Sequence, residues 1–416
     1  MNSPATTAPG SESKGSLLQQ PRAVWAVAFA CVISFMGLGL VDPILASLKD
    51  SLGATTGQVS LLFTSYLVVT AVAMLITGFV SSRIGVKWTL LLGLAIIVIF
   101  SAVGGSMNSV GGIVAARAFW GLGNALFIAT SLATIVSLSA GSLKQAVLLY
   151  ESALGIGIGL GPIVGGQLGQ HISWRGPFFG VAVLMFLGLV ATFFLLPPTP
   201  KPEHTTSVAD PIKALRHPGL LLVSLVSLLY NFGFFTLMAV APYPLKMSAA
   251  GVGWVFFGWG VALAFTSIWG APWLERRVGT IAAIVTALVG FAIVLTAMAL
   301  LSAHPAALVV CVVVAGFFLG INNTVITTLV MGAAPVPRPV ASAAYSFVRF
   351  FGGAVGAYVA GKLAEHSFHT PFYLGAGVTL VALIVLLAFR RFIPVGGAPG
   401  HGSEQEAEIL EAADAD

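Results

Sequence analysis

Four ionisable side chains fall within long apolar segments of the chain. Once residues in the termini, loops and segment ends are set aside, the acids Asp42 and Glu151 and the bases Arg117 and Arg349 remain. An ionised side chain in the middle of hydrocarbon costs about 2.5 to 3.5 kcal/mol unless a partner or water relieves it. An acid beside arginine has a lowered pKa, and an acid in apolar surroundings has a raised one. A conformational change that separates such a pair takes up a proton, so we predict that these four residues couple the protein to protons.

These residues also have simpler interpretations. Asp42 and Pro43 can merely start the turn that leaves an apolar segment, and Arg117 can be a fixed strut between helices. Glu151 can bind protons, attract a cationic substrate, or remain in a water-filled vestibule. Whether Asp42 meets Arg117, or Glu151 meets Arg349, is not decided by the sequence.

The segments that hold these residues are typical of a polytopic membrane protein. The 416 residues are 57% hydrophobic and 8% charged, with a mean hydropathy of +0.99. About 20 apolar residues are needed for a helix to cross the hydrocarbon core, and helices satisfy their own backbone groups in lipid. We predict an all-α fold with twelve transmembrane helices, at residues 24–45, 59–80, 88–107, 110–138, 145–171, 176–197, 219–243, 251–274, 279–302, 305–331, 340–366 and 370–393.

Basic residues predict the orientation of these helices. With the N-terminus inside, thirteen Lys and Arg residues lie on the cytoplasmic side, whereas Lys49, Arg175, Lys246 and Lys362 lie outside. This asymmetry predicts that both termini lie in the cytoplasm. We expect the protein in the cytoplasmic (inner) membrane. The net charge of +5 is thereby explained without nucleic acid. Because there is no phosphate-binding loop and no His/Cys cluster, we expect no cofactor, no metal and no enzymatic activity.

The chain divides into two similar halves. We expect a disordered N-terminus (1–21), a six-helix bundle (22–197), a cytoplasmic linker (198–217), a second six-helix bundle (218–393) and an acidic tail (394–416). A shift of the second half onto the first pairs Tyr150 with Tyr345, Gly157 with Gly352 and Gly161 with Gly356. A parallel repeat of this kind is typical of transporters that work by alternating access, with the site between the halves.

Several motifs carry a family resemblance. They are Gly157-x-x-x-Gly161-Pro162-x-x-Gly165-Gly166, Gly78-x-x-x-x-Arg83-x-Gly85-x-Lys87, Arg117-x-x-x-Gly121-x-Gly123 and Gly37-x-Gly39-x-x-Asp42-Pro43. On these residues the chain resembles the major facilitator superfamily and, within it, the twelve-helix drug:proton antiporters. It departs from the family pattern at Ser82, where an acid is usual, and at Trp120, where Gln is usual.

The resemblance implies a function and a site. The glycine strip at 157–166 is expected to press the two halves together and limit leak, although ordinary tight packing explains glycine spacing as well. We expect proton-coupled export of small amphipathic compounds by a monomer in the lipid bilayer. A single-metabolite exporter or facilitator (for a sugar or an amino acid) and a non-transporting receptor are the alternatives. The predicted substrate-binding residues are Trp120, Asn124, Tyr150, Asn231, Phe232, Phe235, Asn322, Asn323 and Tyr345.

Overall fold

The computed structural model describes residues 20–139, 143–198, 207–330, 333–336 and 338–393, and these residues form helices without any strand. The predicted N-terminal segment 1–21, except for its last two residues, and the acidic tail 394–416 lie outside the described residues. So do residues 199–206 of the predicted linker 198–217. The prediction of an all-helical protein is confirmed.

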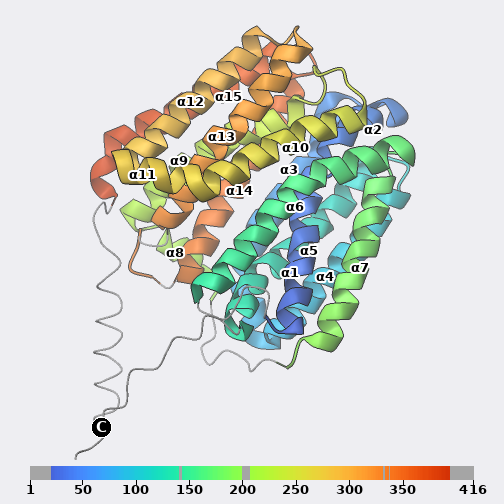
Figure 1. Cartoon of the computed structure of the whole chain (residues 1–416), viewed down its shortest axis with the longest axis vertical. Helices are drawn as coiled ribbons and strands as arrows, with labels where there is room; N and C mark the ends of the chain where they lie inside the picture. Colours follow the sequence, from blue (N-terminus) through green and yellow to red (C-terminus); the bar gives the residue numbers. More distant parts are fainter. Residues whose placement is uncertain (1–19, 140–142, 199–206, 331–332, 337, 394–416) are drawn as a thin grey trace, which may run out of the picture.

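The first half contains six long helices and two short ones (Figure 1). The long helices are α1 (Arg22–Gly39), α3 (Thr56–Ile84), α4 (Val86–Ser106), α5 (Val110–Leu138), α6 (Leu143–His171) and α7 (Gly176–Leu195). The short ones follow α1 directly and are the 3₁₀ turn η1 (Asp42–Ile44) and α2 (Leu45–Leu52).

The second half opens with a short helix and again contains long ones (Figure 1). In chain order its α-helices are α8 (Ala209–Ala214), α9 (Pro218–Val240), α10 (Ala249–Phe265), α11 (Ala271–Val278), α12 (Thr280–Leu300), α13 (Pro305–Val330), α14 (Arg338–Leu363) and α15 (His369–Phe389). A five-residue π-helical segment, η2 (Thr266–Gly270), joins α10 to α11, and the 3₁₀ turn η3 (Arg390–Phe392) follows α15.

The helix bounds differ from the predicted segments most clearly at the first one. The predicted segment 24–45 is not one helix, because α1 ends at Gly39 and Asp42 lies in the 3₁₀ turn. The residue before a proline is disfavoured in α-helical conformation, and the proline ring removes a backbone donor. The backbone at Asp42 and Pro43 is thus a turn between two helices, which hydropathy alone does not reveal.

Nine helices of the described residues are long and apolar enough to cross a membrane: α3, α4, α5, α7, α9, the α10–α11 run, α12, α13 and α15 with its following turn. The other three long helices, α1, α6 and α14, are not among these nine. The finding supports a multi-pass membrane protein.

The helices pack in two groups that we name the first group (α1 to α7) and the second group (α9 to α15). In the first group α6 packs on α1, and in the second group α14 packs on α9. Between the groups, α3 packs on α14 and α6 packs on α10. We call the end of the bundle where α3 begins and α14 ends the Glu365 end, and the opposite end, where α4 begins, the Lys87 end.

One turn recurs in both groups. Gly85 joins α3 to α4 with φ +87°, and Gly279 joins α11 to α12 with φ +83°. This left-handed region is costly for residues with a Cβ, which explains glycine at both positions. The two turns occupy matching places in the two groups, so the repeat seen in the sequence extends beyond the glycine-rich helices.

Candidate functional site

The glycine strip of α6 makes its closest contact with α1, inside the first group. A Cβ at Gly157 would lie 2.5 Å from the Val32 carbonyl oxygen, and one at Gly161 would lie 2.6 Å from that of Met36. A Cβ at Gly165 would likewise meet the backbone of α1. Only glycine allows two helix backbones to approach this closely.

The other side of the same motif faces the second group. A Cβ at Gly166 would lie 2.5 Å from the Ala249 carbonyl oxygen, and Gly253 of α10 lies against the backbone of Pro162. In this conformation Pro162 and Gly166 therefore lie against the second group, whereas Gly157, Gly161 and Gly165 lie against α1 of the first group. Because glycines recur on two faces of one helix, spacing alone does not say which neighbour each face meets.

The matching helix of the second group repeats the close packing. Gly352 and Gly356 of α14 lie against the backbone of α9 at Leu228 and Phe232, where a Cβ would clash with carbonyl oxygens. Phe232 and Phe235 are buried, and the Phe235 ring lies where a Cβ on Gly353 would be. These two predicted substrate-binding residues therefore contribute at least to the packing of α9 on α14.

Arg117 is enclosed by aromatic rings. Its side chain is 1% exposed, and its guanidinium carbon lies 4.4 Å from the Tyr66 ring centre and 4.6 Å from that of Trp120. One guanidinium nitrogen donates to the Gly37 carbonyl oxygen over 3.4 Å, in the last turn of α1 before Asp42. The side chains of Asp42 and Glu151 lie outside the described part of the structure, so the predicted acid–arginine pairs stay predictions.

The family usually has Gln at the position of Trp120. The larger indole ring of Trp120 fits against α1 because the residue opposite it is Gly37, which has no side chain. A Cβ at Gly37 would lie 2.9 Å from the Trp120 ring. Nearby, the Ser34 hydroxyl donates to the Asn124 side-chain oxygen, and Tyr150 lies edge-on to Phe35 with ring centres 5.7 Å apart. The first group thus brings Trp120, Asn124 and Tyr150 against α1.

The second group brings together a polar set from three helices. The Tyr230 hydroxyl donates to Asn323 Oδ1 over 3.2 Å, and the Ser227 hydroxyl donates to the Tyr345 hydroxyl over 3.2 Å. Asn231 donates to the Ser227 carbonyl oxygen over 2.8 Å. Arg349 lies one turn beyond Tyr345 on α14, with its guanidinium carbon 5.7 Å from the Tyr345 ring centre. The fold thus brings together four predicted site residues that are far apart in the sequence, namely Asn231, Asn323, Tyr345 and Arg349.

The motif between α3 and α4 lies at the Lys87 end. Ser82, which replaces the usual acid, donates to the Phe79 carbonyl oxygen, and Arg83 covers the Phe79 ring at 4.1 Å. The Lys87 ammonium donates to the carbonyl oxygens of Phe193, over 3.1 Å, and Leu196 at the end of α7. A cation at a helix C-terminus is stabilising. Lys87 thus ties α4 to α7, while Gly78 is exposed on α3.

Two features of the site were not predicted. The first is Tyr66, which is buried beneath Arg117 and is one of many apolar or aromatic residues on its helix. The second is a contact at the Glu365 end, where the Thr55 hydroxyl and the Gly57 amide both donate to Glu365. A capping box of Thr55 and Gln58 marks the start of α3. That pattern is readable in the sequence, but its partner on α14 is not.

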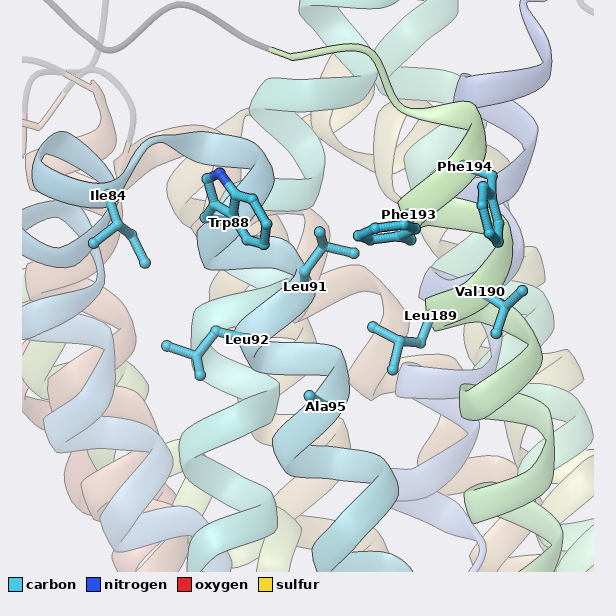
Figure 2. A pocket seen from close by; sticks show the side chains of 9 residues that line it. All are labelled: Ile84, Trp88, Leu91, Leu92, Ala95, Leu189, Val190, Phe193 and Phe194. Carbon is cyan, nitrogen blue, oxygen red and sulfur yellow. The ribbon is translucent and has the colours of Figure 1, made fainter.

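A groove on the side of the bundle is lined by none of the predicted site residues (Figure 2). It measures about 670 Å³ and runs between α4 and α7, with one residue from the end of α3. Its nine side chains, all apolar or aromatic, are Ile84, Trp88, Leu91, Leu92, Ala95, Leu189, Val190, Phe193 and Phe194. Trp88 and Phe194 are largely exposed. Such a surface suits hydrocarbon chains, not a polar group.

Comparison with known proteins places the chain in a family. It is 52% identical over 389 residues to the multidrug efflux protein YfmO of Bacillus subtilis (strain 168), covering 93% of this chain and 98% of that protein. Over a shorter stretch of 177 residues the chain is 30% identical to the tetracenomycin C resistance and export protein of Streptomyces glaucescens. This match covers 41% of this chain and 33% of that protein.

Solved structures share the fold. A mutant of the nucleoside transporter NupG superposes with a TM-score of 0.75 at 13% identity, covering 88% of this chain and 99% of that one. The human organic anion transporter MFSD10 (TETRAN) superposes with a TM-score of 0.68 at 20% identity, with the same coverage. The family model of the Major Facilitator Superfamily matches residues 27–244 and 223–412. The chain therefore belongs to the major facilitator superfamily.

Proposed function

We propose that this chain exports small amphipathic compounds across the cytoplasmic membrane in exchange for protons. The observation that carries the proposal is the identity of 52% to a multidrug efflux protein over nearly the whole of both chains. The motif at Gly157–Gly166 supports it, because its glycines hold α6 against both α1 and α10. We propose that the protein acts as a monomer.

The proposed architecture has twelve membrane-spanning helices. To the nine candidate spans we add α1, α6 and α14, which lie in the same bundle as their long neighbours. The two groups then correspond to bundles 22–197 and 218–393, with the linker 198–217 and both termini in the cytoplasm. In this orientation the Lys87 end is cytoplasmic and carries the basic residues Arg83, Lys87, Arg276 and Arg277, as the positive-inside rule requires.

We propose that the conformation described here is inward-facing. The hydrogen bonds between the groups made by described residues lie toward the Glu365 end: Thr55 and Gly57 with Glu365, Gln170 with the Ala250 amide, and Thr64 with the Ala354 carbonyl oxygen. Lys49 also lies 5.6 Å from the Tyr243 ring centre there. Closure at this end supports access to the site from the cytoplasm.

In the proposed cycle an acid binds a proton from the outside and gives it up inside. Asp42 and Glu151 are the proposed acceptors, and Arg117 is the proposed charge partner of Asp42. The contact between Arg117 and Gly37 supports this pairing, because it places the guanidinium in the last turn before Asp42. Protonation would weaken the pairing, favour the outward-facing state and so release substrate outside.

The test is a resistance and efflux panel in a host that lacks its own pumps. Cationic and neutral amphiphiles are loaded, and efflux is followed with and without a proton uncoupler. The proposal predicts efflux that the uncoupler abolishes. If no amphiphile is exported, the proposal fails, and uncoupler-sensitive export of one sugar or amino acid would identify the protein as a single-metabolite exporter instead.

A further inference from the structure

Two arginines of the interior have different surroundings. Arg117 is almost fully buried between two aromatic rings and donates to a backbone carbonyl oxygen. Arg349 is only half-buried, and among the described residues its Nε finds no hydrogen-bond partner although that atom is buried. Arg349 thus has a donor to offer to a bound molecule.

No described carboxylate neutralises Arg349. The ion pair of Lys362 and Glu365 lies near the Glu365 end and does not involve Arg349. Two aromatic rings lie near the Arg349 guanidinium carbon, with the ring centre of Phe350 at 5.1 Å and that of Tyr345 at 5.7 Å. A cation within a membrane-spanning helix is costly and is normally kept for function.

A buried amide lies in the same region. Asn322 of α13 is 1% exposed, and neither its side-chain nitrogen nor its side-chain oxygen has a hydrogen-bond partner among the described residues. The Tyr230 hydroxyl lies beside this amide and within electrostatic range of Arg349, although it donates to Asn323. Buried polar atoms are nearly always paired, so the Asn322 amide has hydrogen-bonding capacity that the described residues do not fill with well-formed bonds.

The region lies where the two groups meet. Phe350, the neighbour of Arg349, packs against a cluster of the first group formed by Ala73, Met74 and Ala125. Transporters built from repeats bind their substrates at such an interface. Arg349 thus lies on α14, the helix that packs against α3 of the first group, and Tyr230 and Asn322 lie close to it within the second group.

We propose that Arg349 and Asn322 bind a carboxylate, or a comparable anionic oxygen group, on the transported compound. Arg349 Nε–H and the Asn322 amide N–H donate to its oxygens, and Tyr230 and Tyr345 flank it. A charge-assisted hydrogen bond of this kind is about twice as strong as a neutral one. The inference rests on the proposed export function and narrows its substrates to amphiphiles that carry an anionic group, zwitterions included.

Two dyes with one scaffold test this. Rhodamine 110 carries a free carboxylate, and rhodamine 123 is its methyl ester. Binding of each dye to the purified full-length protein is measured by fluorescence polarisation for the wild type, Arg349→Gln, Arg349→Lys and Asn322→Leu. We expect Arg349→Gln to weaken rhodamine 110 binding by about tenfold or more and rhodamine 123 binding by less than about twofold. Arg349→Lys should be intermediate, because it keeps the charge without the planar fork.

The controls separate binding from folding and from export. Arg277→Gln changes an exposed arginine and should leave both affinities unchanged. Asn322→Leu removes an unpaired amide, so it should fold at least as stably as the wild type while it weakens rhodamine 110 binding. Equal losses for both dyes, or no binding of rhodamine 110 by the wild type, would overturn the inference. Binding requires no proton gradient, so this failure is distinct from a failure of proton-coupled export.

Discussion

The Thr55 hydroxyl donates to Glu365 Oε1 over 2.6 Å and so joins the start of α3 to the residues that follow α14. The Gly57 amide donates to the same oxygen over 3.2 Å. The carboxylate of the second group thus caps a helix of the first group, where the helix dipole favours negative charge. This contact spans the two groups, so their separation at the Glu365 end must break it.

The contact predicts a pH-dependent conformational equilibrium. The Thr55 hydrogen bond, helped by Lys362 and the Gly57 amide, lowers the pKa of the Glu365 carboxyl below its ordinary value. Because the pKa is lowered, the contact is fully present when the pH is above the ordinary pKa of a carboxyl group. It is lost as the pH falls through the lowered pKa of Glu365. Acidification should therefore favour opening at this end, and Glu365→Gln should do the same at neutral pH.

Spin labels can measure this opening. Labels at Ser51 and Met247, both exposed and near the Glu365 end, report the separation of the groups in a protein whose Cys31 and Cys311 are replaced by alanine. We expect longer distances in Glu365→Gln at neutral pH. Glu275→Gln is the matched control, since Glu275 accepts from Thr280 over 2.7 Å within one group. Identical distances in all three proteins would refute the role of the contact.

The glycine strip predicts a position-specific effect on stability. Gly161→Ala places a methyl group against the Met36 carbonyl oxygen and should destabilise the protein by about 1 to 3 kcal/mol, the usual cost of overpacking. Gly159→Ala on the same helix meets nothing within 4 Å and should have little effect. Thermal unfolding in one detergent compares the two, and equal melting temperatures would contradict the described packing.

Tyr66 should act through its ring. Its hydroxyl is buried without a hydrogen-bond partner among the described residues, whereas its ring faces Arg117. We expect Tyr66→Phe to keep stability and transport, and Tyr66→Leu to lose about 2 kcal/mol, the value of a desolvated cation–π contact. The comparison is made by thermal unfolding. Loss of stability in Tyr66→Phe would show that the hydroxyl matters instead.

Gly37 and Trp120 should be energetically coupled. Gly37→Ala forces its methyl group into a buried, rigid indole ring, so it should destabilise the wild type by about 1 to 3 kcal/mol. On a Trp120→Gln background, which restores the residue usual in the family, the same change should cost much less. A double-mutant cycle on unfolding free energies measures the difference. Additive effects would mean that the two residues do not share the space.

Much of the fold could be predicted from the sequence because hydropathy reports local composition. Apolar length located the long helices, and the repeat linked α6 to α14. The end of α1 at Gly39 was missed, since the following Leu-Val-Asp-Pro run stays mostly apolar while Pro43 interrupts the helical backbone. Helix ends at such prolines depend on backbone geometry and not on hydrophobicity.

The site was predicted only in part because it depends on contacts between distant segments. Sequence reasoning selected Arg117 and Trp120 separately, whereas in the structure the Trp120 ring lies beside the Arg117 guanidinium. It could not select Tyr66, nor the partner of Thr55, because neither has a local pattern that distinguishes it. The face of α6 that meets α1 was also hidden, since glycines at 157, 161, 165 and 166 lie on two faces of one helix.

Proton movement driven by substrate tests the central claim most directly. The purified protein is reconstituted in liposomes that contain a pH-sensitive dye, and an amphiphile exported in the efflux panel is added across an imposed gradient. The account predicts that the wild type moves protons against substrate and that Asp42→Asn and Glu151→Gln each reduce this movement strongly. Full substrate-driven proton movement in both variants, or none in the wild type, would contradict it.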